Sequence, residues 1–215
     1  MRRIHISSAF RLRARLLLVA LIMTFPALLA AQAEDLAPRT KGRADAPIVI
    51  YEMSDFQCPF CRAFALETMP GLEREYIATG KVRLVFINLP MTGIHQHAEL
   101  AAQVALCAAR EGKFWPVHDL LFKRQAEWSG RTDPQGYLVA LADSAGTKHA
   151  RLAPCVTSGA TRSGVAADRE AATRSGAAAT PTFYIEGGLI DGAAPLEAFR
   201  EVLDSIYRIK TAAKR

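Results

Sequence analysis

The chain has 215 residues and half of them are hydrophobic, so it is long enough for one domain with a buried core. Its 27 Lys and Arg residues exceed its 21 Asp and Glu residues, which gives a net charge of +6. Five of the arginines and none of the acidic residues lie within residues 1–33, which leaves 22 basic and 21 acidic residues beyond them. The basic character therefore belongs to the N-terminal segment, and we expect no nucleic-acid partner.

The N-terminal segment has the pattern of a secretory signal peptide. Its arginines are followed by an apolar run over residues 16–29, and Ala31-Gln32-Ala33 has the form of a cleavage site. The apolar run is short for a membrane span, and Pro26 breaks it near its end. We therefore expect a signal peptide over residues 1–33, a mature protein that begins at Glu34, and export to the periplasm or cell envelope.

The folded domain is expected to begin shortly after this segment. Residues 34–46 are polar and contain Pro38 and Gly42, so we expect a flexible lead-in there. Residues 48–51 are apolar and rich in β-branched side chains, which is typical of a strand buried on both faces. We place the domain at residues 47–210.

A helical pattern follows the first strand and continues to Tyr76, and Pro70 is expected to kink or interrupt the helix. Residues 82–89 have the pattern of a second strand. A strand, a helix and a second strand predict a parallel pair joined by a crossover. From about residue 97 to residue 175 we find only helical patterns, so we expect a helical insertion there.

Strand patterns return near the C-terminus, at residues 182–186 and 189–190. Gly187-Gly188 between them is a two-residue hairpin signal. Residues 195–209 carry apolar side chains at helical spacing and predict a final helix. The expected order is βαβ, a helical insertion and ββα, which is an α/β fold.

Directly after the first strand, Cys58 and Cys61 flank Pro59 and Phe60 in a CxxC motif. A redox cysteine must form a thiolate, and the N-terminus of a helix stabilises negative charge. Pro59 suits the first position of a helix, because its missing N–H would have no partner there. We therefore expect Cys58 to be the nucleophile and Cys61, one turn later, to be the resolving thiol.

A CxxC pair is also half of a zinc site, but a zinc site needs a second pair of ligands. Cys107 and Cys155 lie far apart and lack metal-ligand spacing. A copper-binding CxxC is a further alternative, although it needs neither the proline nor the helical insertion. Because the sequence contains no Gly-rich phosphate loop and no acid-rich metal cluster, we expect no cofactor and no bound metal.

Three features together resemble the DsbA-like thiol:disulfide oxidoreductases of the thioredoxin superfamily. These features are the DFQCPFC motif, the order of the elements with its helical insertion, and Ala179-Thr180-Pro181-Thr182-Phe183. The resemblance covers roughly residues 45–209 and implies a thioredoxin fold, βαβ and ββα, with a helical insertion between the two halves. It also implies a cis peptide bond before Pro181, with Thr180 and Pro181 beside the cysteines. The alternative is a proline at the edge of a strand.

The resemblance assigns roles to further residues. It implies a buried acid at Glu52 that passes a proton to or from Cys61, whereas the alternative is a surface glutamate. It implies a structural disulfide between Cys107 and Cys155, whereas the alternative is two buried free thiols. Phe60 stands where the best-known member of the family has histidine, so we expect a less oxidising protein.

The sequence therefore predicts an exported thiol:disulfide oxidoreductase that introduces disulfide bonds into folding proteins. Its partners are expected to be reduced or misoxidised client proteins, and the resemblance adds a quinone-linked membrane protein that reoxidises it. We expect a monomer. A disulfide reductase or isomerase of the same fold is one alternative, and a CxxC metal-binding module is another.

Overall fold

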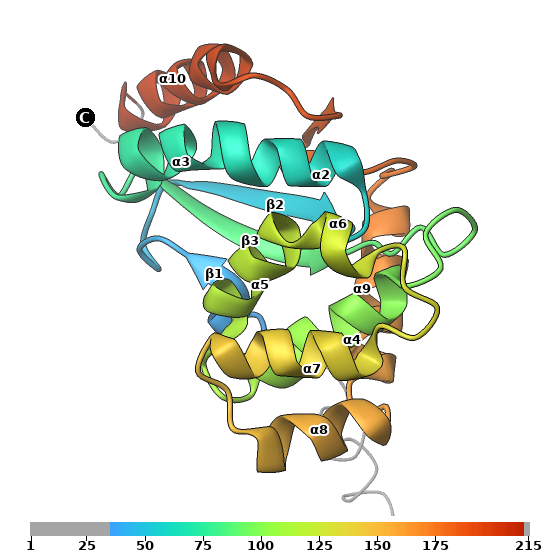
Figure 1. Ribbon diagram of the computed structural model, residues 1–215. Coiled ribbons are helices and arrows are strands. Elements are labelled where there is room, and N and C mark those ends of the chain that lie inside the picture. Colours follow the sequence, from blue (N-terminus) through green and yellow to red (C-terminus); the bar gives the residue numbers. More distant parts are fainter. Residues whose placement is uncertain (1–34, 213–215) are drawn as a thin grey trace, which may run out of the picture. The chain divides into compact units, whose positions relative to one another are not determined.

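The computed structural model describes residues 35–212, so the predicted signal peptide lies outside the described residues (Figure 1). The sheet has the strand order β1-β3-β2-β4-β5. Its strands are β1 (Thr40–Lys41), β2 (Ile48–Ser54), β3 (Val82–Asn88), β4 (Thr182–Ile185) and β5 (Gly188–Asp191). The helices are η1 (Ala37–Arg39), α2 (Pro59–Ala63), η2 (Phe64–Thr68), α3 (Met69–Leu72), η3 (Glu73–Ile77), α4 (Ala98–Ala109), α5 (Phe114–Lys123), α6 (Gln125–Trp128), α7 (Gln135–Ser144), α8 (His149–Thr157), α9 (Arg162–Arg174) and α10 (Leu196–Ala212).

The sheet has one parallel pair at its centre. Strands β2 and β3 run parallel, from the pair Ile48 and Val82 to the pair Ser54 and Asn88. The other neighbouring strands are antiparallel. The parallel pair, the helical insertion between β3 and β4, and the final ββα unit confirm the predicted fold class.

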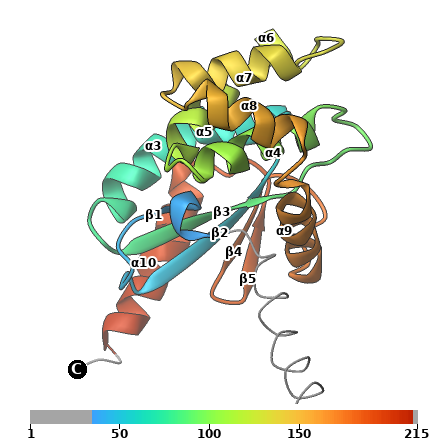
Figure 2. The ribbon, with the colours of Figure 1, turned by 90° about the horizontal axis from the view of Figure 1, so that it is seen from below.

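Alternate residues of β2 point to opposite faces of the sheet, and each face is covered by helices (Figure 2). Ile48 and Ile50 pack in one cluster with Phe64 and Leu72 of the helix after β2 and with Phe199 of α10. Met53, on the other face, shares a cluster with Ala172 of α9. These two layers bury the sheet and hold the end of β2 at the start of α2.

The helix after β2 is continuous, although its hydrogen-bonding pattern changes twice. The segments α2, η2, α3 and η3 follow one another without a break, and η2 and η3 are π-helical turns. Pro70 occupies the second position of α3, and the Met69 N–H before it bonds the Phe64 carbonyl. The expected interruption at Pro70 therefore takes the form of a π-turn, because proline has no N–H and crowds the preceding turn of an α-helix.

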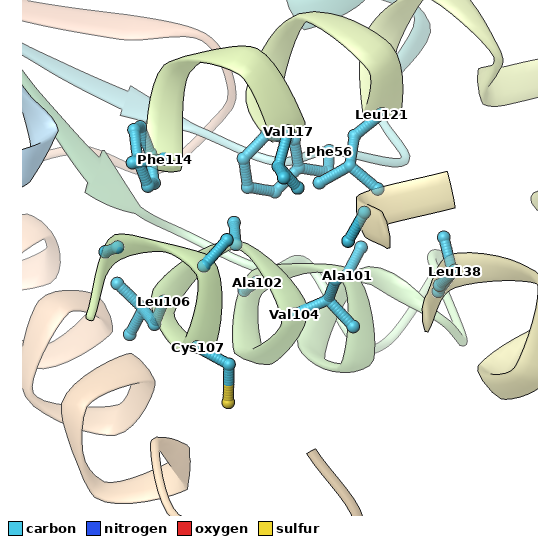
Figure 3. Packing of buried hydrophobic residues seen from close by; sticks show 14 of the residues in the cluster. Phe56, Ala101, Ala102, Val104, Leu106, Cys107, Phe114, Val117, Leu121 and Leu138 are labelled. Atoms are coloured by element: carbon cyan, nitrogen blue, oxygen red, sulfur yellow. The ribbon is translucent and has the colours of Figure 1, made fainter. Parts of the chain in front are cut away.

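Helices α4 to α8 form a block with its own core (Figure 3). Ala101 and Val104 of α4 face Val117 and Leu121 of α5 in this core. Phe56, two residues before the CxxC motif, enters the same cluster. Its ring stacks on Phe86 of β3 with 5.0 Å between centroids. The block is therefore packed directly against the segment that carries the cysteines. Among the helices of residues 35–212, none has both the length and the apolar composition needed to cross a membrane.

The expectation of a flexible lead-in is wrong for residues 37–41. They form η1 and the edge strand β1, which pairs with β3. The Arg39 side chain is only 1% exposed and forms two hydrogen bonds with Asp168 of α9. The Asn88 side-chain amide donates a 2.7 Å bond to the same carboxylate. A buried guanidinium needs such a partner, and Asp168 lies 129 residues away, so the local polar composition of the lead-in could not reveal it.

The C-terminal hairpin differs from the prediction by one residue. Its two turn residues are Glu186 and Gly187, not Gly187 and Gly188, because Ile185 pairs directly with Gly188. Both turn residues have positive φ angles, 48° and 89°, as a tight type I′ hairpin turn requires. Glu186 thus takes the left-handed conformation that the sequence analysis assigned to a second glycine.

Candidate active site

The structure places Cys58 at the N-cap of α2, immediately after the turn that follows β2. Pro59 occupies the first helical position, and the Cys58 carbonyl accepts a 3.1 Å hydrogen bond from the Arg62 N–H. Both Cys58 and Cys61 are free thiols, with exposed fractions of 4% and 0%. Cys58 therefore lies at the positive end of the helix, and Cys61 lies one turn behind it in the core.

The two thiols have opposite pKa shifts. A hydrogen bond from the Cys61 thiol lowers the pKa of Cys58 to about 6, with help from the Thr180 side chain and the backbone N–H groups of Cys61 and Phe60. Burial raises the pKa of Cys61 well above its ordinary value, and the nearby Cys58 sulfur raises it further. At neutral pH the outer sulfur is thus a thiolate while the inner one holds its proton.

The Thr180-Pro181 turn lies against the outer cysteine. The peptide bond between these residues is cis. The Cys58 thiol donates a 3.4 Å hydrogen bond to the Thr180 carbonyl, although the two residues are 122 positions apart. The structure thereby brings together three of the residues that the resemblance singled out: Cys58, Thr180 and Pro181.

Glu52 lies within β2 and is 1% exposed, so it is not a surface residue. Its neighbours in the adjacent strands are Phe86 of β3 and Phe183 of β4. Burial among these rings raises the pKa of the carboxyl to about 8. Neither of its oxygens has a hydrogen-bond partner among the described residues. Glu52 is therefore a protonated acid at neutral pH, on the strand that leads to the cysteines.

Sequence reasoning missed a polar network around Asp55, the first residue of the DFQCPFC motif. One oxygen of the buried Asp55 carboxylate accepts a 2.7 Å bond from the Gln57 N–H. The other accepts a 2.8 Å bond from the Met91 N–H and lies 2.8 Å from His95 Nδ1. An aspartate that bonds the N–H two residues later is a local turn signal that the sequence does contain. The contacts with Met91 and His95, in contrast, depend on the fold.

A second missed residue is Gln125, at the start of α6 in the helical block. Its side-chain amide donates hydrogen bonds of 2.8 and 3.0 Å to the carbonyls of Phe56 and Cys58. These bonds tie the insertion to the backbone of the outer cysteine. Nothing in the sequence near Gln125 indicates this contact.

A groove of about 420 Å³ adjoins the cysteines. The loop between β3 and α4 contributes Leu89, Met91 and Ile94, and the segment before the cis proline contributes Ala177. The loop is anchored to Asp55 through the Met91 N–H. Because its lining is largely apolar and it lies between the CxxC turn and the cis-proline turn, this groove is suited to a polypeptide segment.

Cys107 and Cys155 form a disulfide bond in the structure, and the alternative of two buried free thiols does not describe it. Cys107 lies on α4 and Cys155 on α8, so the bond joins two helices of the insertion. The Cys107 side chain points away from α5 (Figure 3). The bond is remote in sequence from Cys58 and Cys61, and we expect it to act on stability alone.

Replacing both Cys107 and Cys155 by alanine is expected to lower the free energy of unfolding by roughly 4 kcal/mol, because the unfolded chain loses a 48-residue loop constraint. Denaturant unfolding of the double variant and the wild type measures this difference. The thiol-exchange rate of the remaining pair is expected to stay unchanged. A variant with full stability and a slower exchange rate would contradict this assignment.

Comparisons with known proteins agree with this geometry. The family model described as Thioredoxin matches residues 34–205. Disulfide bond formation protein D of Bacillus subtilis is 26% identical over 164 residues, covering 76% of this chain and 74% of that protein. The Na(+)/H(+) antiporter NhaA 3 of Salinispora tropica is 32% identical over 167 residues, covering 78% of this chain and 24% of the antiporter. The chain thus spans about a quarter of that relative's length.

Solved structures show the same fold. The crystal structure of oxidised BdbD from Bacillus subtilis has a TM-score of 0.73 and 25% identity, covering 82% of this chain and 96% of that one. Alpha-DsbA1 of Wolbachia pipientis has a TM-score of 0.73 and 21% identity, covering 82% of this chain and 94% of its own. With a matching family model over most of its length and these structural neighbours, the chain is a DsbA-like member of the thioredoxin superfamily.

Proposed function

We propose that this protein is an exported thiol:disulfide oxidoreductase that introduces disulfide bonds into folding client proteins. The observation that carries the proposal is the contrast between the two cysteines. Cys58 is a thiolate at a helix N-terminus with a pKa of about 6, and Cys61 is a buried thiol with a raised pKa. A stabilised Cys58 thiolate favours the reduced form of the pair, and this makes the disulfide form an oxidant.

The proposed reaction is thiol-disulfide exchange through Cys58. In the oxidised protein, a client thiolate attacks Cys58 Sγ, the bond to Cys61 breaks, and Cys61 takes the electron pair and a proton. A second client thiolate then attacks the client sulfur of the mixed disulfide, and Cys58 leaves as a thiolate. The client loses two electrons and the Cys58-Cys61 pair gains them.

Three features around Cys58 support the binding of a client polypeptide. The Thr180 carbonyl beside the sulfur is a backbone acceptor of the kind that an extended segment uses. The apolar groove adjoins it. The Phe60 side chain, next to Cys58 in the motif, is 64% exposed and offers an apolar contact at the reacting sulfur.

The relatives and the N-terminal sequence support the setting of the reaction. Two of the relatives reported above are named for disulfide bond formation or for DsbA. The segment over residues 1–33 has the form of a signal peptide, and an oxidising compartment beyond the cytoplasm favours disulfide chemistry. We infer that the protein acts as a monomer and is reoxidised by a quinone-linked membrane partner.

Refolding of a reduced, disulfide-containing client tests the proposal. The oxidised full-length protein, cleaved by its exporting host, is mixed with the reduced client, and disulfide formation and client activity are followed. The Cys58-Cys61 equilibrium against glutathione buffers is measured beside it. We expect client oxidation, together with a pair more oxidising than structural disulfides.

Two other outcomes would replace the proposal. Failure to oxidise the reduced client, together with rapid repair of a client with scrambled disulfides, would assign the protein as an isomerase or reductase. Stoichiometric copper or zinc in the purified protein, lost when Cys58 is replaced, would assign a metal-binding module instead.

A further inference from the structure

Ser54 lies between the buried acid and the inner cysteine. Glu52 and Ser54 are two residues apart on β2, so their side chains point to the same face of the sheet. This is the face on which Ile48 and Ile50 pack against the helix that carries Cys61. The Asp55 N–H, directly after Ser54, donates a 3.4 Å hydrogen bond to Cys61 Sγ. The Cys61 sulfur therefore lies at the end of β2, next to Ser54 and beyond Glu52.

The Ser54 hydroxyl is buried without a hydrogen-bond partner. Ser54 is 1% exposed, and its oxygen and both oxygens of Glu52 have no partner among the described residues. Leaving a buried hydroxyl unpaired costs about 1–3 kcal/mol, whereas an alanine would cost nothing of this kind. Three unpaired oxygens beside a buried thiol therefore point to groups that exchange a proton.

The electrostatics place Ser54 next to both groups. Burial is the largest influence on Glu52 and on Cys61 and raises both pKa values, and the Ser54 hydroxyl opposes this rise in each case. Lys41 also lowers the pKa of Glu52, and Cys58 raises that of Cys61. Ser54 is the one side chain that acts on both pKa values among these influences.

The surroundings hold few other charged groups that face this cluster. Lys41 of β1 forms a 2.9 Å ion pair with Glu73 of η3. His118 of α5 packs its ring 5.2 Å from that of Phe86, and burial lowers its pKa, so it is neutral. The neighbours of Glu52 on β3 and β4 are phenylalanines, and α10 contributes Phe199 to the adjoining core.

We propose that the Ser54 hydroxyl relays the proton between the Glu52 carboxyl and the Cys61 sulfur. The inference rests on the proposed thiol-disulfide exchange. When a client thiolate breaks the Cys58-Cys61 bond, the Ser54 O–H gives its proton to the Cys61 thiolate and takes the proton of the Glu52 carboxylic acid. The reverse transfers occur when Cys61 is deprotonated to attack a mixed disulfide at Cys58. Ser54 is thus a positioning residue whose hydroxyl returns to its starting state after each transfer.

Three variants of the full-length protein test the relay. Ser54→Ala removes the hydroxyl, Ser54→Thr keeps it, and Thr68→Ala removes a different buried hydroxyl from the same helix layer, where it bonds the Ala194 carbonyl. Reduced protein is mixed with oxidised glutathione, and the step in which Cys61 displaces glutathione from Cys58 is followed by stopped flow from pH 5 to 9. Alkylation of Cys58 is measured in parallel.

We expect Ser54→Ala to slow the displacement step by about tenfold to a hundredfold, which is typical of a lost proton-transfer group. The alkylation rate of Cys58 should stay the same, Ser54→Thr should restore the displacement step, and Thr68→Ala should leave it unchanged. Equal rates in Ser54→Ala and the wild type across the pH range would overturn the relay. Equal slowing by Thr68→Ala would do the same, because it would show a general effect of packing.

The wild type gives an independent check. A relay moves two protons in the displacement step, so its rate should fall with deuterium content along a curved line. A straight line would mean that one proton moves and would overturn the proposal. Glutathione exchange does not require client oxidation, so failure of the client assay alone would reject the oxidase function and leave the relay standing.

Discussion

Replacing Cys58 by serine is expected to abolish oxidation of a reduced client. The outer sulfur is the one that lies at the helix N-terminus, with its pKa lowered to about 6 and the Thr180 carbonyl 3.4 Å away. A serine hydroxyl cannot form the mixed disulfide, so no step of the exchange remains. The measurement is the rate of disulfide formation in the client, with the Cys107→Ala, Cys155→Ala double variant as the control that retains activity.

Replacing Cys61 by alanine is expected to have a different effect. A client disulfide can still react with the Cys58 thiolate, but no inner thiol is present to release the client. Mixed disulfides between the variant and client should therefore accumulate and be visible after acid quenching and non-reducing electrophoresis. If Cys61→Ala forms none while Cys58→Ser does, the roles of the two cysteines are reversed.

The pH dependence of alkylation distinguishes the two sulfurs in the wild type. Only a thiolate reacts, so the rate at Cys58 should rise as the pH passes through about 6 and level off above it. Cys61, buried and with a raised pKa, should stay unmodified over the same range. Mass mapping after brief treatment at pH 6 measures both. Faster modification of Cys61 would contradict the placement of the nucleophile.

The sequence was sufficient to predict the fold class and the position of the redox pair. Alternating and periodic apolar residues located the strands and helices, and Pro59 indicated that Cys58 begins a helix. These signals are local, because each depends on residues within one or two turns of the chain. The cis-proline turn was recognised through the resemblance, since nothing near Pro181 places it against residue 58.

The features that sequence reasoning missed are contacts between distant segments. Arg39 is buried because Asp168 is there to receive it, and Gln125 fixes the Cys58 carbonyl from the helical insertion. In both cases the local residues are ordinary polar side chains. Their burial is decided by packing of elements that are 129 and 67 residues apart. Composition alone therefore assigned residues 37–41 to a flexible lead-in.

Ser54 illustrates a different limit. The pattern of β2 gave its place on a strand, and its neighbour two residues earlier was already a candidate acid. What could not be read was which of the two faces lies under the helix that carries Cys61. That depends on the packing of Ile48 and Ile50 against Phe64 and Leu72, and this packing puts both polar side chains beneath the active-site helix.

Replacing Glu52 by glutamine is expected to stabilise the protein at neutral and alkaline pH. The folded carboxyl has a pKa of about 8 against an ordinary value of 4.5, so between these values the folded state holds a proton that the unfolded state has lost. The stability of the wild type should therefore fall as the pH rises from 4.5 to 8 and level off above that. By linkage the cost is on the order of 3 kcal/mol at pH 7.

The experiment compares denaturant unfolding of reduced wild type and Glu52→Gln from pH 4 to 9. The difference in stability cancels the contribution of Cys58, which titrates in both proteins. We expect no more than a small difference at pH 4 and a gain for the variant that grows up to about pH 8. Glu67→Gln, which removes an exposed carboxyl from the helix after β2, is the matched control and should show no such growth.

A gain in stability would sharpen the case for function at this position. Glutamine keeps the size of the side chain but cannot carry a proton between its oxygens and a neighbour, so the same variant should slow the displacement of glutathione by Cys61. A fold that is less stable with the acid than without it gains nothing from the carboxyl except this transfer. If Glu52→Gln is instead less stable than the wild type at pH 8, the carboxyl is ionised and paired in the fold. The proton would then have to reach Cys61 from the solvent.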